Sequence, residues 1–112
     1  MQEAHRHEVE EYQTVDGRSP FSDWIENLQD RHARVRVRVR VDRLSLGNFG
    51  DARSLGDSLH ELRIDHGPGY RVYFGQAGER IVLLLCGGTK RTQSRDIELA
   101  REYWRDYRSR TP

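Results

Sequence analysis

The sequence has one cysteine, one lysine and no long apolar run. A lone cysteine, Cys86, cannot form a disulfide within the chain, which excludes the class of small secreted domains held by disulfides. No apolar stretch approaches the roughly 20 residues of a membrane-spanning helix. The N-terminal segment MQEAHRHEVEEY is acidic and lacks the apolar core of a signal peptide. We therefore expect a cytoplasmic protein that makes no membrane contact.

Charge, by contrast, is abundant and unevenly spread. Charged residues make up 33% of the 112-residue chain and hydrophobic residues 35%, and the hydrophobic residues are clustered, so we expect residues 1–112 to form a single domain. The net charge is only +1, yet residues 1–30 hold two arginines and eight acids, whereas residues 31–112 hold 17 basic residues and ten acids. This asymmetry suits contact with a polyanion, and ordinary solvated charge would produce it equally well.

An amphipathic helix is the clearest local prediction of the first half. Residues 8–13 predict a weak first strand, and Asp16-Gly17 predicts the turn after it. Ser19 suits a helix N-cap and Pro20 the first helical position. The apolar residues that follow have helical spacing: Phe21, Trp24, Ile25 and Leu28.

The segment RVRVRVRVDRL, residues 34–44, is compatible with two periods. Its alternation is typical of a strand with one basic face. Four apolar residues, however, also follow a helical stripe that continues beyond the alternation: Ala33, Val37, Val41 and Leu44. Asp30 can cap such a helix and Gly47 can end it. We therefore predict a second helix, which forms a hairpin with the first.

The second half predicts three strands and a helix. Residues 59–64, 70–74 and 80–86 have strand patterns joined by short turns, and Gly87-Gly88 is expected to end the third strand. Residues 92–108 predict a final helix. The expected order is β-α-α-β-β-β-α, an α+β domain with an antiparallel sheet packed against the N-terminal helical hairpin. We expect all helices on one face and the other face free to meet a partner.

Five sequence motifs carry a family resemblance. They are LSLGNFGD at 44–51, ELRI at 61–64, GPGYRVYF at 67–74, LLLCGGTK at 83–90, and the group Gln93, Asp96 and Ile97. At this spacing they closely resemble the RelE/ParE superfamily of toxins from bacterial type II toxin–antitoxin modules. The match is to the HigB-like branch, often labelled "addiction module killer protein", and it extends from about Val9 to Tyr107. The resemblance implies a RelE-like fold.

The resemblance also implies an activity and partners. RelE-like and HigB-like members cut mRNA in the ribosomal A site, so it implies an endoribonuclease that inhibits translation on the ribosome, without cofactor or metal. ParE-like members instead inhibit DNA gyrase and cut nothing, and fold alone does not separate the two. Either toxin is neutralised by a cognate antitoxin, expected to be a small helix-turn-helix DNA-binding protein, within a possible toxin–antitoxin heterotetramer. A basic binding module without toxicity is the third alternative.

Arg63, Arg71 and Lys90 are the first candidates for catalysis. Metal-free RNA cleavage needs a base for the 2′-hydroxyl, cations at the phosphate and an acid for the leaving oxygen. Arg63 and Arg71 lie on neighbouring predicted strands, and both match arginine positions of the family; a guanidinium fits two phosphate oxygens. Lys90 matches a basic position of the family's active surface. Solvated arginines paired with Glu61 or Asp65 are the structural alternative.

The remaining site predictions concern proton transfer and RNA contact. Titratable candidates for base and acid are His60, His66 and Glu61, and a structural or solvated role is the alternative for each of them. Predicted RNA contacts are Arg91, Tyr70, Tyr73, Arg36 and Arg40, with the tyrosines equally suited to packing. Gln93 and Asp96 match a supporting motif, in which Asp96 could pair with Arg63 or Arg71. The catalytic tyrosine of RelE has no counterpart in residues 94–97, which leaves the ParE-like alternative open. His5 and His7 have metal-ligand spacing but no apparent third ligand.

Overall fold

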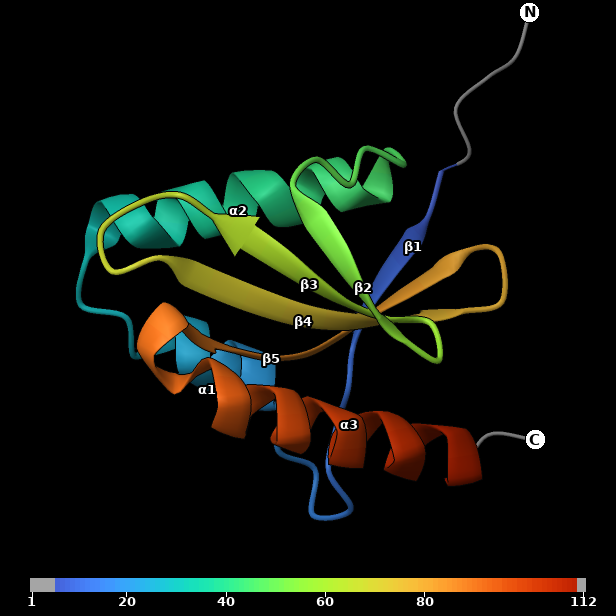
Figure 1. The fold of residues 1–112 in the computed structure, drawn as a ribbon. Helices are drawn as coiled ribbons and strands as arrows, with labels where there is room; N and C mark the ends of the chain where they lie inside the picture. Colours follow the sequence, from blue (N-terminus) through green and yellow to red (C-terminus); the bar gives the residue numbers. More distant parts are fainter. Residues whose placement is uncertain (1–5, 111–112) are drawn as a thin grey trace, which may run out of the picture.

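The computed structural model describes residues 6–110 as one α+β domain (Figure 1). Its elements are β1 (Glu8–Glu11), α1 (Pro20–Glu26), α2 (Arg31–Ser45), β2 (Ala52–Gly56), β3 (Leu59–Ile64), β4 (Tyr70–Ala77), β5 (Ile81–Thr89), the 3-10 turn η1 (Lys90–Thr92) and α3 (Gln93–Arg110). The predicted class and order are confirmed, with one strand more than expected, β2. Within residues 6–110, no helix has the length and apolar character needed to cross a membrane.

The five strands form one mixed sheet in the order β1-β5-β4-β3-β2. The β2-β3-β4-β5 meander is antiparallel, as predicted, but β1 runs parallel to β5. A parallel pair cannot be joined by a tight turn, and here the α1–α2 hairpin and strands β2, β3 and β4 supply the long connection between β1 and β5. The N-terminal strand therefore forms one edge of the sheet and β2 the other.

Helices cover both faces of the sheet, so the prediction of a free face is wrong. Figure 1 shows α2 and α3 on opposite sides. The apolar run of β5 explains this: Val82 and Leu84 pack in the core under α1 and α2, whereas Leu83 and Leu85 pack with Ala100 of α3. A strand that is apolar on both sides needs cover on both sides.

The arginine–valine segment forms helix α2, as predicted. The Asp30 side chain accepts hydrogen bonds from the backbone amides of His32 and Ala33, and these bonds lower the pKa of Asp30. Gly47, with φ of 79°, ends the helix, and its amide and that of Asn48 bond to the last carbonyls in a Schellman arrangement. The predicted apolar stripe is buried: Ala33, Val37, Val41 and Leu44. The alternation therefore places the other two valines, Val35 and Val39, on the exposed side.

Helix α1 begins at Pro20, as predicted, but its cap differs from the expectation. Ser19 has the extended backbone of an N-cap, yet its hydroxyl donates to Glu11 and makes no bond to the helix. Phe21 and Ile25 are buried against α2 and the sheet. The contact with Glu11 thus ties the start of α1 to β1.

The predicted break at Gly87-Gly88 is wrong, because β5 continues to Thr89. A side chain at Gly87 would overlap the Trp24 ring on one face, and one at Gly88 would overlap the Asp96 carboxylate on the other. The glycines thus allow α1 and α3 to approach the sheet closely. This close approach brings the start of α3 to the end of β5.

Candidate functional site

Two rows of side chains cross the sheet on the face that α3 partly covers. In the first row, Arg53 of β2, Glu61 of β3, Tyr73 of β4 and Cys86 of β5 are cross-strand neighbours. In the second row, Arg63, Arg71 and Gly88 are neighbours. Side chains two residues apart on a strand share a face. Arg63 and Arg71 therefore lie beside Glu61 and Tyr73, as the predicted hairpin required.

Glu61 is the centre of this arrangement and its side chain is 0% exposed. Its Oε2 accepts from the Tyr73 hydroxyl at 3.1 Å and from the Gln93 amide at 2.7 Å. Its Oε1 lies 3.3 Å from Nη2 of Arg53 and 3.7 Å from Nη1 of Arg71. Burial and the Glu61 charge raise the pKa of Tyr73, so the phenol stays protonated and donates. We call these five residues the Glu61 cluster: Arg53, Glu61, Arg71, Tyr73 and Gln93.

The Glu61 cluster has more positive than negative charge. Arg53 and Arg71 share a single carboxylate, whereas Arg63 has its own partner, Asp51, at 2.7 Å. Glu61 Oε1 and Arg71 Nε are buried and lack a hydrogen-bond partner among the described residues. The Arg53 side chain is 51% exposed and that of Arg71 is 11% exposed. The surplus cation is therefore accessible from outside, which suits a bound phosphate.

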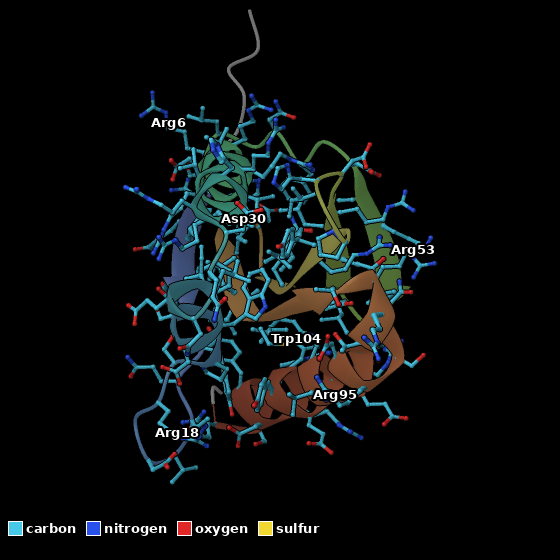
Figure 2. All side chains as sticks on the ribbon, turned by 90° about the vertical axis from the view of Figure 1, so that its left-hand side faces the viewer. Arg6, Arg18, Asp30, Arg53, Arg95 and Trp104 are labelled. Atoms are coloured by element: carbon cyan, nitrogen blue, oxygen red, sulfur yellow. The ribbon has the colours of Figure 1, made fainter. Side chains whose placement is uncertain are left out.

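Lys90 lies at the same end of the sheet. The residue before it, Thr89, is the cross-strand neighbour of Tyr70, and the Lys90 amide donates to the Gly69 carbonyl at 2.7 Å. Lys90 and Arg91 are both exposed. Figure 2 views this end of the molecule and labels Arg53 on β2 and Arg95 at the start of α3. The predicted group of Arg63, Arg71 and Lys90 is therefore brought together at one end of the sheet.

Gln93 and Asp96 have different roles from one another. Gln93 is part of the Glu61 cluster, because its side-chain amide donates to the Glu61 carboxylate. Asp96 is buried over Gly88, accepts a hydrogen bond from Thr92 and lies 3.7 Å from Arg95. The suggested pairing of Asp96 with Arg63 or Arg71 is therefore wrong, because the short η1 turn directs Asp96 to its own segment.

The two candidate histidines lie on the opposite face. His60 alternates with Glu61 and stacks on Phe74 with 5.1 Å between ring centroids. Desolvation lowers the pKa of His60. His66 lies 3.2 Å from Asp30, the cap of α2, and stacks near Tyr70. The strand alternation that groups Glu61 with Arg63 thus separates both histidines from the Glu61 cluster, and they do not complete it.

The predicted RNA-contacting residues are mostly engaged within the protein. Tyr70 is buried between Trp24 and His66, and Tyr73 is buried against Glu61, so neither ring has a face free for a base. The Arg40 guanidinium donates to the Arg63 carbonyl at 2.7 Å and so ties α2 to the end of β3. Arg36 and Arg91 remain exposed. Packing, which was the alternative for the tyrosines, is the role the structure gives them.

Sequence reasoning missed two charged residues that complete the site. Arg53 lies on the unexpected strand β2, and Asp51, just before it, is the true partner of Arg63. Asp51 could have been noticed as the last residue of the LSLGNFGD motif, whereas no local pattern pointed to Arg53, because β2 is too short and polar to display a period. Pairing with β3 is what places Arg53 over Glu61.

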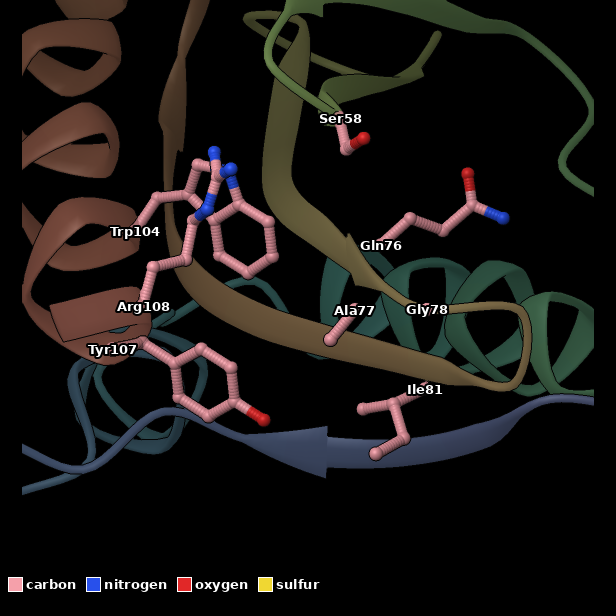
Figure 3. Close-up of a pocket in the computed structure, with 8 residues that line it drawn as sticks. All are labelled: Ser58, Gln76, Ala77, Gly78, Ile81, Trp104, Tyr107 and Arg108. Carbon is pink, nitrogen blue, oxygen red and sulfur yellow. The ribbon is translucent and has the colours of Figure 1, made fainter. Parts of the chain in front are cut away.

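A separate cleft of about 480 Å³ lies at the far end of α3 (Figure 3). Trp104, Tyr107 and Arg108 line one side, and Ser58 and Gln76 line the other. The polar groups of Trp104 and Arg108 both donate to the Asp57 carbonyl, in a turn where Asp57 and Ser58 have positive φ. These two hydrogen bonds hold the β2–β3 turn against α3.

The described residues contain neither a reactive thiol nor a group of side chains placed to hold a metal. Burial raises the pKa of Cys86 to about 12, so the thiol is unreactive near neutral pH. Residues 6–110 contain no group of three histidine, cysteine or carboxylate side chains placed to hold a metal. His5, one half of the His5/His7 pair, lies outside the described residues.

Comparison with known proteins identifies a relative without a stated activity. No model of a known protein family matches the chain. A protein of Haemophilus influenzae (strain Rd), described as "Uncharacterized protein", is 46% identical over 81 residues, which cover 72% of this chain and 82% of that protein. Identity at this level over most of both chains implies common descent and a common fold. The chain therefore belongs to the same family as this Haemophilus influenzae protein.

Proposed function

We propose that this protein is the toxin of a type II toxin–antitoxin module, of the HigB-like branch of the RelE/ParE superfamily. In this proposal it works in the cytoplasm, cuts mRNA on the ribosome and is neutralised by a cognate antitoxin. The observation that supports it most is the surplus cation of the Glu61 cluster, where two guanidinium groups share one buried carboxylate. A phosphate at the exposed Arg53 edge would supply the missing negative charge.

The chemistry assigned to the site is transesterification. The 2′-hydroxyl of one nucleotide gives its proton to a solvent water as its oxygen attacks the adjacent phosphorus, the bond to the 5′-oxygen breaks, and a cyclic phosphate and a free 5′-hydroxyl result. Arg71 and Arg53 stabilise the negative charge that grows on the phosphate oxygens. Glu61, buried and without access to substrate, is a positioning residue that holds both guanidinium groups. Lys90, exposed at the rim, adds a third cation and is the candidate to protonate the leaving oxygen.

A second function, inhibition of DNA gyrase without cleavage, has its own support. His60 and His66, the two histidines among the candidates, lie on the opposite face from the Glu61 cluster. The segment of residues 94–97 also lacks a tyrosine. A cationic site without a histidine can bind an anion without cutting it.

The two functions are separated by primer extension on a reporter mRNA after induction of the protein. The endonuclease produces cuts in register with codons, and Arg53→Ala reduces the cutting rate by about 100-fold, as expected for loss of one charge-stabilising donor. Arg105→Ala, at an exposed position farther along α3, serves as the matched control and leaves the rate unchanged. Intact mRNA with inhibited supercoiling by purified gyrase would favour the gyrase inhibitor, and harmless expression would favour a binding module.

The antitoxin is tested separately. Co-expression with the protein encoded by the adjacent gene should relieve growth arrest, and the two proteins should purify together. A purified complex that contains two copies of each chain would support the expected heterotetramer.

A further inference from the structure

Helix α2 carries an exposed apolar ridge. Val35 and Val39, one turn apart, are 62% and 41% exposed, whereas the other valines of the helix are buried in the core. α2 forms the outer layer on its side of the sheet (Figure 1). Single exposed apolar side chains are common on protein surfaces, but two that lie one helical turn apart form a continuous apolar patch, and such patches often mark interaction sites. The Glu61 cluster lies on the opposite face of the sheet and therefore does not explain why Val35 and Val39 are exposed.

Hollows lie on both sides of this ridge. One, of about 320 Å³, lies between α2 and the end of β3 and includes Ile64 in its wall. The other, of about 430 Å³, lies between α2 and α1 and includes Ile25. Val35 and Val39 line both. A ridge between two partly apolar hollows is the relief that a second helix, with apolar side chains one turn apart, can fit.

The same surface is basic on balance, because five arginines and three acids, Glu26, Asp42 and Asp65, line the two hollows. Helix α2 contains six arginines and one acid. Among residues 6–110, none of these arginines makes an ion pair, and Arg40 alone makes side-chain hydrogen bonds, to backbone carbonyls. Arg34 and Arg38 border the hollow near α1, and Arg36 and Arg43 border the hollow near β3. Like charges one turn apart repel one another, and an acidic partner would relieve this repulsion.

We propose that the outer face of α2 is a docking surface for an acidic amphipathic helix of a partner protein. The apolar side of that helix packs on Val35 and Val39, and its carboxylates pair with the arginines that flank the ridge. Nucleic acid fits less well, because phosphates gain nothing from exposed valines and the ridge offers no aromatic ring for a base. A second copy of α2 fits less well, because two such basic surfaces repel each other. The proposal concerns a face remote from the Glu61 cluster and does not depend on RNA cleavage or gyrase inhibition.

The test uses a fluorescent peptide of about 20 residues, with leucine at helical spacing and glutamate between, titrated with the full chain. Anisotropy should show saturable binding that weakens as salt rises. Val35→Ser with Val39→Ser keeps the charge and should weaken binding at least tenfold; Arg36→Gln with Arg38→Gln should do so independently. Val15→Ser removes a valine that is 85% exposed elsewhere and should change nothing. Unaltered thermal unfolding of each variant shows that the fold is kept.

Three results would overturn the proposal. The first is the absence of saturable peptide binding. The second is binding of a single-stranded RNA that competes with the peptide and survives the valine-to-serine changes, which would identify a nucleic-acid surface. The third is self-association of the chain alone, lost in the Val35→Ser, Val39→Ser variant by sedimentation, which would identify an interface between copies.

Discussion

Glu61 is a negatively charged side chain in a place where side chains are usually apolar. Its burial is tolerated because four neighbours donate to it or lie close with positive charge. A buried charge without such partners would cost several kcal/mol. The carboxylate in turn holds the nearly buried guanidinium of Arg71 on the face of the sheet that α3 partly covers. Stability and the geometry of the cations thus depend on one residue.

Replacement of Glu61 by glutamine tests this dependence. Glu61→Gln keeps the volume but leaves Arg53 and Arg71 without a counter-charge, so the free energy of unfolding should fall by about 2–3 kcal/mol, below the full cost of a broken buried pair because Arg53 is half exposed. Urea unfolding measures the change. Glu102→Gln, at an exposed site on α3, is the control and should cost almost nothing. Equal midpoints for the two variants would contradict the role given to Glu61.

His60 predicts a dependence of stability on pH. Burial lowers its pKa in the folded state, so folding favours the neutral ring. Its contribution to stability is complete above the unfolded pKa of about 6.5 and is lost as the pH falls below it, because the unfolded chain then binds the proton more readily. Between about pH 6.5 and 5, stability should fall less steeply in His60→Leu than in the natural protein. An unchanged slope in His60→Leu would refute the assignment.

At the scale of single elements, the two glycines of β5 allow helices α1 and α3 to pack closely on the sheet. Gly87→Ala should destabilise the fold by about 1–3 kcal/mol, because its methyl group overlaps the Trp24 ring. Trp24→Leu removes most of that ring, so Gly87→Ala should cost at least about 1 kcal/mol less in the Trp24→Leu background. A double-mutant cycle by urea unfolding gives this coupling. Strict additivity would show that the ring moves away freely.

The elements also show how far sequence reasoning extends. The helices were predictable because caps and apolar stripes are local: Asp30 and Gly47 bound α2 as expected. Strand β2 was not, since Ala52–Gly56 is an edge strand with little apolar content, and only its pairing with β3 defines it. The prediction of a break at Gly87-Gly88 failed because the lack of side chains there serves packing against two helices, at Trp24 and Asp96. Such requirements come from tertiary packing and leave no local pattern.

The candidate site likewise contains residues that the sequence could group and residues that it could not. Arg63, Arg71 and Glu61 share a face because a strand alternates, and this alternation was visible in LHELRI. It also separates His60 from them, which the same two-residue period could have indicated. Arg53 and Asp51 depended on the unpredicted strand. The histidines were chosen by their pKa class, and chemistry alone does not say on which side of a strand a side chain lies.

At the scale of the whole molecule, the sheet is protected unevenly. β4 and β5 are central, paired on both sides and covered by helices, whereas β2 is an edge with mostly exposed side chains. Amide hydrogen exchange should therefore be slowest around residues 72–74 and 83–85 and faster by orders of magnitude in residues 52–56. Exchange measured by mass spectrometry or NMR gives this profile. Equal protection of β2 and β4 would require a cover over the β2 edge.

The single lysine of the sequence, Lys90, allows the protein to be labelled at one chosen side chain. Lys90 is exposed at the end of the sheet where Arg63 and Arg71 meet, and every other basic side chain of the sequence that carries a permanent charge is an arginine. Amine-selective dyes therefore have one side-chain target, apart from the terminal amine. A fluorophore attached there would lie at the same end of the sheet as the surplus cation and would report the arrival of a polyanion optically, without any substitution in the chain.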